Sequence, residues 1–106
     1  MTKVVVIPGI CGFSTKIEVN KTSKRRVSIT ISSDCEHVSR LAGVLKDADV
    51  FDVLKPHGFF VQTTAAECSL HAACPVPVGI IKTIEVEAGL ALPKDVSIHF
   101  EKDVNI

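Results

Sequence analysis

Two alternating runs, Lys16-Ile17-Glu18-Val19-Asn20 and Val27-Ser28-Ile29-Thr30-Ile31-Ser32, decide the fold class of this chain of 106 residues. In both runs Val or Ile occupies every second position and the positions between are polar or charged, which is the period of a half-buried strand. The stretch between the two runs is polar and suits a turn. The sequence therefore predicts an antiparallel hairpin with one apolar face.

A helix is expected directly after the hairpin. Ser33 and Glu36 have the spacing of a capping box, in which side chains satisfy backbone N–H groups at the start of a helix. Apolar residues then recur at the i, i+3, i+4 and i+7 spacing that places them on one face of a helix. These residues are Val38, Leu41, Ala42 and Leu45.

Three further helices are predicted. The first begins at Asp49 and ends before the run Pro56-His57-Gly58, which breaks a helix. The second covers residues 64–73, from another capping box to the point where the next proline disfavours helical backbone. The third covers residues 75–88, with prolines in its first turn and Gly89 directly after its end. Its β-branched residues make a strand the competing prediction for this segment.

Strands are expected at residues 4–7, 59–61 and 96–100, because these segments are short apolar or alternating runs. With the hairpin and the helices they predict an α+β fold. We expect a two-layer sandwich in which a mixed or antiparallel sheet carries helices on one face. No linker or internal repeat interrupts residues 1–106, so we treat the chain as one domain.

The composition argues against several classes of protein. Apolar residues make up 46% of the chain, which argues against disorder, and some of this apolar surface is available for a homodimer. Twelve Lys and Arg balance twelve Asp and Glu, which argues against nucleic-acid binding and a polybasic membrane anchor. The longest nearly uncharged apolar stretch, residues 72–81, is too short to cross a bilayer. Without a signal-peptide pattern, we expect a cytoplasmic protein.

The four cysteines are the main indication of function. Thiols stay reduced in the cytoplasm, so we expect these cysteines to serve another purpose than forming disulfides. Cys11 lies in a loop between Gly9 and Gly12, and these glycines let the backbone approach a bound ion or cofactor closely. Cys35 lies in the first turn of the predicted helix after the hairpin. The positive end of the helix dipole favours a thiolate there, the form that binds metals.

The segment Cys68-Ser69-Leu70-His71-Ala72-Ala73-Cys74 places three ligand types at a spacing of three. Cys68 falls just past the first turn of the predicted second helix, and Cys74 directly precedes Pro75. On one helix Cys68 and His71 share a face, and a break before Pro75 lets Cys74 turn towards them. Thiolates and imidazoles are the ligands of zinc sites, and thiolates those of iron–sulfur clusters.

The order of these motifs resembles the iron–sulfur cluster assembly scaffolds of the IscU/NifU N-terminal type over residues 8–90. The matching features are Cys11-Gly12 before a strand, Cys35 opening a helix, and Cys68-Ser69 in a later helix. The resemblance implies an α+β fold whose three cysteines converge at one end and hold zinc or a nascent cluster. The chain departs from the family's pattern at Phe13, where the family has Asp.

We therefore expect a small metal or iron–sulfur carrier or scaffold rather than an enzyme, with a protein of a metal-delivery pathway as its partner. The expected cofactor is zinc or an iron–sulfur cluster. The expected ligands are Cys11, Cys35, Cys68 and Cys74, with His71 as an alternate or fifth ligand. His37 is expected to point elsewhere on its helix.

Two alternatives stay open at this point. One is a thiol redox protein, in which Cys35 or Cys68 is the reactive thiol and another cysteine resolves it. The other is a structural or binding module whose cysteines are buried and inert, since free cysteine often only fills space in a core.

Overall fold

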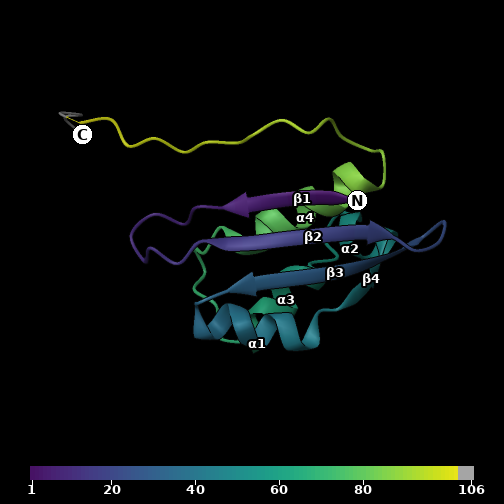
Figure 1. The fold of residues 1–106 in the computed structure, drawn as a ribbon, viewed down its shortest axis with the longest axis horizontal. Coiled ribbons are helices and arrows are strands. Elements are labelled where there is room, and N and C mark those ends of the chain that lie inside the picture. Colours follow the sequence, from purple (N-terminus) through teal and green to yellow (C-terminus); the bar gives the residue numbers. More distant parts are fainter. Residues whose placement is uncertain (103–106) are drawn as a thin grey trace.

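The computed structural model describes residues 1–102 and contains one four-stranded antiparallel sheet (Figure 1). The strands lie in the order β1, β2, β3, β4, and each pairs with its sequence neighbour. Their bounds are β1 (Thr2–Val6), β2 (Thr15–Lys21), β3 (Arg26–Ser33) and β4 (Asp47–Asp49).

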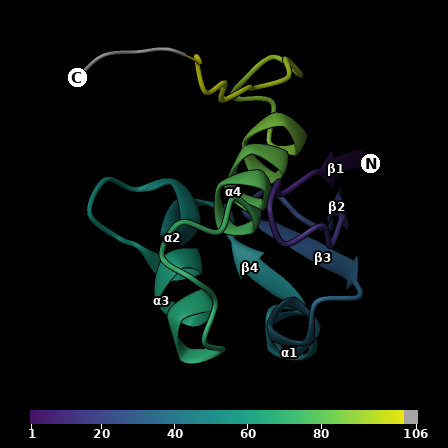
Figure 2. The same cartoon turned by 90° about the vertical axis from the view of Figure 1, so that its left-hand side faces the viewer.

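Four helices cover one face of this sheet and leave the other face open (Figure 2). Their bounds are α1 (Glu36–Val44), α2 (Val50–Leu54), α3 (Phe60–Glu67) and α4 (Val76–Glu87). The predicted α+β fold, with helices on one side of an antiparallel sheet, is confirmed. No helix among residues 1–102 is both long enough and apolar enough to cross a membrane.

The hairpin of β2 and β3 forms as its alternation predicts. Ile17 pairs with Ile31 and Val19 pairs with Ile29, and all four side chains are buried under the helices. Lys16 lies on the open face and is exposed. Successive side chains of a strand point to opposite faces of the sheet. Once helices cover one face, every second side chain is therefore buried and the others meet solvent.

The core lies between the sheet and the helices, where α4 packs on β1 and β2 and α1 packs on β3. Gly79 allows α4 to approach β1 closely, because a Cβ atom there would stand 2.5 Å from Cγ2 of Val6. The largest fully buried aliphatic side chains are Ile17, Leu41, Leu45, Ile80, Ile84, Val19, Val27, Val38, Val61 and Val76.

The region between α2 and α4 differs from its prediction. Residues 59–61 form no strand, because Phe59 adopts left-handed backbone (φ 52°) and α3 begins at Phe60. The expected capping box at Thr64 is also wrong, since the Thr64 hydroxyl donates to the carbonyl of Phe60 inside α3. Helix α3 therefore ends at Glu67, and residues 68–75 form an irregular connection.

Strand β4 was not predicted, and the predicted last strand is unpaired. The sequence Asp47-Ala48-Asp49 has no apolar alternation to indicate a strand, yet it pairs with the start of β3. Residues 93–102, which we call the C-terminal arm, follow the end of α4 and run back along the length of the sheet on its β1 side, without pairing with it (Figures 1 and 2). The alternating residues Val96, Ile98 and Phe100 are 57%, 83% and 96% exposed.

Candidate functional site

Three connections that carry the cysteines meet at one end of the sheet, which we call the cysteine end (Figure 1). They are the β1–β2 loop with Cys11, the β3–α1 junction with Cys35, and residues 68–75 with Cys68 and Cys74. The antiparallel order of the strands brings these connections together, because β1 and β3 both end there and β2 begins there.

Cys35 is the N-cap residue of α1 and is half-buried against the core. Its backbone N–H donates to Oγ of Ser33 at 3.1 Å, and its carbonyl accepts from the N–H of Ser39 at 2.8 Å. Its side chain forms no capping hydrogen bond. The predicted position at a helix start is confirmed, and the thiol lies where the helix dipole favours negative charge.

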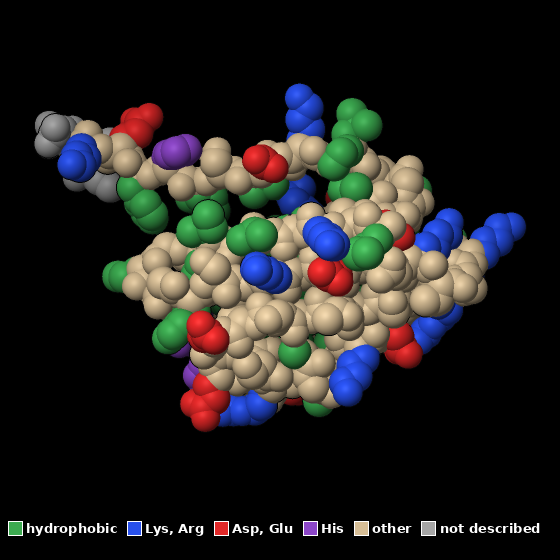
Figure 3. Space-filling view, viewed as in Figure 1, with side chains coloured by type: hydrophobic (Ala, Val, Ile, Leu, Met, Phe, Trp, Pro, Cys, Tyr) green, Lys and Arg blue, Asp and Glu red, His purple; other side chains and the backbone are tan. Residues whose placement is uncertain are grey.

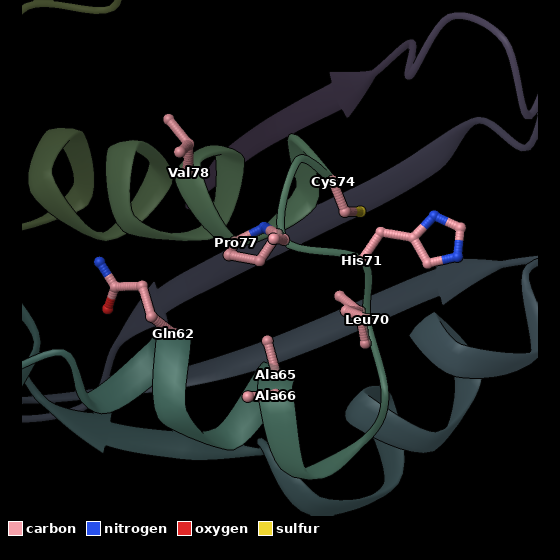
Figure 4. A pocket seen from close by; sticks show the side chains of 9 residues that line it. Gln62, Ala65, Ala66, Leu70, His71, Cys74, Pro77 and Val78 are labelled. Carbon is pink, nitrogen blue, oxygen red and sulfur yellow. The ribbon is translucent and has the colours of Figure 1, made fainter.

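Cys74 directly precedes Pro75, the N-cap residue of α4, and is also half-buried against the core. Its N–H donates to the carbonyl of His71 at 3.0 Å, which closes a turn. Figure 4 shows the Cys74 sulfur and the His71 ring pointing to the same side of this turn. The turn therefore presents one thiol and one imidazole together.

Cys68 lies in a different environment from the predicted one. It is the C-cap residue of α3 and not a residue near a helix start, because α3 begins earlier than its sequence indicates. Its side chain is 7% exposed and belongs to the hydrophobic core. The dipole at a helix C-terminus disfavours a thiolate, so this position is the least suited of the four to bind an ion.

Cys11 is exposed in the β1–β2 loop. Gly9 and Gly12 both have left-handed backbone, with φ angles of 89° and 74°, and the N–H of Gly12 donates to the carbonyl of Gly9. A Cβ atom on either glycine would meet nothing within 4 Å. The two glycines therefore serve the backbone geometry of the loop that presents Cys11.

Two histidines from distant parts of the chain meet at the cysteine end. The rings of His37 in α1 and His71 in the α3–α4 connection have their centroids 6.3 Å apart. Nδ1 of His37 is buried and has no hydrogen-bond partner among residues 1–102. Oγ1 of Thr15, at the start of β2, is a second atom of this kind. The sequence analysis did not predict His37 as a candidate ligand, although its position two residues after Cys35 could have indicated one.

A shallow hollow of about 220 Å³ borders His71 and Cys74 (Figure 4). Its other walls are mainly apolar and come from α3 and α4, including Ala65, Leu70 and Pro77. It is smaller than the roughly 300–1,000 Å³ of sites that enclose organic ligands. The hollow therefore suits a small group or a partner's side chain better than an organic cofactor.

The ligand types lie near one another but do not form a closed cage. Within residues 1–102, no group of three or more His, Cys, Asp and Glu side chains stands close enough to hold one ion. The two carboxylates with shifted pKa values, Asp49 and Glu87, lie at the other end of the sheet, close to the turn of the hairpin and the N-terminus. The cysteine end brings together thiols and imidazoles, and Asp34 and Glu36 flank Cys35 there.

The fold defines an α+β protein whose free cysteines lie on connections at one end of its sheet. A family model matches residues 2–100, and the chain belongs to that family, DUF6951, a family of unknown function. No curated protein and no solved structure matches the chain.

Proposed function

We propose that the protein binds a metal ion or an iron–sulfur cluster at the cysteine end and serves as its carrier or scaffold. The ligands we assign are Cys35, Cys74, His37 and His71, with the exposed Cys11 as a further thiolate. The buried Nδ1 of His37 carries the proposal, because this atom has no hydrogen-bond partner and lies beside the His71 ring.

An unsatisfied buried polar atom costs about 1–3 kcal/mol, and a ligand that bonds to it recovers this free energy. Either nitrogen of a neutral imidazole can bind a metal ion. Two thiolates and two imidazoles form the S₂N₂ donor set of tetrahedral zinc, and a [2Fe–2S] centre can also take two histidines. The residue types at the cysteine end therefore suit zinc or a small cluster.

Binding requires the ligand side chains to move, because no three of them among residues 1–102 stand close enough to hold one ion. Zn–N bonds are about 2.0–2.1 Å long, so two rings 6.3 Å apart at their centroids need only small movements to share an ion. Cys74 and His71 already point to the same side (Figure 4). Cys68 stays outside the ligand set, because it packs in the core.

A carrier must pass its cargo to a partner, and the position of the ligands supports this role. His71 and Cys11 lie on loops and are exposed, so a protein of a metal-delivery pathway can reach an ion bound there. The four free cysteines suit a reducing compartment, and we propose the cytoplasm. The resemblance to cluster assembly scaffolds agrees with the same role.

Metal analysis of the anaerobically purified full chain tests the proposal. We expect about one equivalent of zinc or iron, and a melting temperature that falls when a chelator removes it, since a ligand of the native state stabilises it. Less than roughly a tenth of an equivalent, with a melting temperature indifferent to added zinc, iron and chelator, would overturn it.

Variants then test the ligand assignment. His37→Gln and Cys74→Ser should each weaken zinc binding by at least about 10-fold, as measured by competition with a chromophoric chelator. His57→Gln is the matched control, because His57 is an exposed residue of the turn before α3. An unchanged affinity in His37→Gln would exclude His37 as a ligand.

A thiol redox protein is the second candidate, and the positions of Cys35 and Cys74 at two helix starts favour it. Alkylation of metal-free protein distinguishes the two functions. Rapid reaction of Cys35 far below the pH of about 8.5 at which free thiols ionise would support this candidate. Slow reaction of all four thiols in the native protein would favour inert cysteines.

A further inference from the structure

Strand β1 is the outer strand of the sheet, and its outer edge has no partner among residues 1–102. The run Val4-Val5-Val6-Ile7 contains no charge, and Val5 and Ile7 are 59% and 81% exposed. An uncovered apolar edge offers unpaired backbone N–H and C=O groups to a further strand. A further strand can therefore pair with this edge and cover it.

The C-terminal arm has the properties of such a strand. Its apolar residues Val96, Ile98 and Phe100 alternate with Ser97, His99 and Glu101, which is the period of a strand with two different faces. All of them are exposed. Figure 3 shows the arm as a ridge separate from the body, with hydrophobic side chains on both.

The geometry at the end of α4 turns the chain back along the β1 side of the molecule (Figure 1). Gly89 has left-handed backbone (φ 78°), and the N–H of Leu90 donates to the carbonyl of Glu85 at 3.0 Å, which ends the helix. The chain measures 49 Å along its longest axis against 29 and 25 Å along the others. Its radius of gyration of 14.2 Å exceeds the roughly 13 Å of a compact domain of this length. Among residues 1–102 the arm forms no backbone hydrogen bond with its own β1, and its exposed side chains can therefore reach a second molecule.

We propose that the arm of one copy adds as a fifth strand to the β1 edge of a second copy, so that two copies exchange arms and form a homodimer. The apolar part of the arm has five residues, as β1 does. Val4 and Val6 of β1 are only half-buried on the helix side, because no strand lies beside them. The three apolar residues of the arm, placed on that side, cover both valines and continue the core across the interface.

The charges agree with this pairing. Lys3 is exposed on the open face of β1, and the apolar part of the arm lies between Asp95 and Glu101. An antiparallel arm brings Glu101 near Lys3, and a parallel arm brings Asp95 near it. Either direction therefore sets a carboxylate of the arm against the lysine of the edge.

Mass measurement by light scattering during gel filtration, with the full chain and a chelator present, tests the dimer independently of metal binding. We expect the mass of two chains for the native protein and of one chain for Ile98→Asp. The Ile98 side chain is 83% exposed within the single chain, so the variant keeps the fold of that chain. Ser97→Asp adds the same charge on the opposite face of the arm and should remain a dimer. A monomeric native protein, or a dimeric Ile98→Asp, would overturn the proposal.

Carbodiimide cross-linking of a mixture of ¹⁴N- and ¹⁵N-labelled chains shows which copy supplies the arm. We expect Lys3 joined to Glu101 or Asp95 in peptide pairs of mixed label. The pair Lys3 and Glu18, whose charged atoms are 3.8 Å apart in one chain, is the internal control and should form only within one label. Arm cross-links only within one label would mean that each arm folds back on its own β1, which contradicts exchange.

Discussion

The two outer strands of the sheet differ in length, charge and covering. Strand β4 has three residues, two of which are aspartates, and α2 follows it at once. Strand β1 has five residues and continues into Ile7 with no charge after Lys3. A short acidic edge repels further strands, whereas a longer apolar edge accepts them. The protein thus protects one edge of its sheet and leaves the other available.

Ion pairs hold the β4 edge against β3. The guanidinium of Arg26 lies 2.9 Å from Asp47, and that of Arg25 lies 3.1 Å from Asp49. Arg25 also lies over the ring of Phe51, 4.5 Å from its centroid. These contacts cover the β4 edge with charged side chains, while the charged contacts of β1 are the pair of Lys3 with Glu18 in β2 and that of the N-terminus with Glu87.

The largest difference in stability between the two edges is expected when Ala48→Asp in β4 is compared with Val5→Asp in β1. Ala48 faces the helices and is 2% exposed, so a carboxylate there is buried without a partner and should lower the free energy of unfolding by at least about 3 kcal/mol. Val5 faces solvent, and the same change there should cost less than about 1 kcal/mol. Urea denaturation measures both values, and equal losses would show that the faces are misassigned.

Asp49→Ala should lower the free energy of unfolding, because this carboxylate caps α2 and also pairs with Arg25. It accepts from the N–H groups of Phe51 at 2.8 Å and Asp52 at 3.3 Å. Asp49→Asn is the matched control, since an amide oxygen still caps the helix. Denaturation should show that Asn retains most of the stability, and an equal loss in both variants would assign the effect to the ion pair.

The smallest effect is expected at the β1 edge, where Glu87 ties the start of β1 to α4. Hydrogen bonds from the Thr2 hydroxyl (2.7 Å) and the Lys21 N–H (2.8 Å) hold the pKa of Glu87 below its ordinary value of 4.5. A pKa lowered by folding stabilises the protein above the unfolded value, and this stabilisation is lost as the pH falls through the folded value.

Glu87→Gln should therefore lower the free energy of unfolding by less than about 1 kcal/mol near neutral pH, and the difference from the native protein should disappear in acid. Urea titrations from about pH 6 to about pH 3 measure it. Glu85→Gln, on the same helix, is the control, because the Glu85 side chain takes no part in these contacts with Thr2 and Lys21. A difference that grows on acidification would contradict the assigned direction of the shift.

The candidate site could be predicted only in part. The positions of Cys35 and Cys74 at helix starts followed from neighbouring residues, because the apolar period of α1 and the prolines of α4 are local signals. The expected capping box of Ser33 and Glu36 does not form, since Cys35 is the N-cap residue and Oγ of Ser33 accepts from the Cys35 N–H. The error at Cys68 came from placing α3 too late, since the left-handed Phe59 that precedes it has no sequence signature. The meeting of His37 with His71 depends on how α1 packs beside the α3–α4 connection, and no local pattern contains that information.

The sequence by itself determined the hairpin, the amphipathic α1 and the proline start of α4. Each of these depends on the period or the backbone preference of adjacent residues, and such preferences act before any tertiary contact forms. Only the tertiary structure decided that β4 would close one edge, that the arm would leave the other edge uncovered, and that two histidines would meet. These arrangements join residues far apart in the chain, and the packing of all the elements around one core selects them.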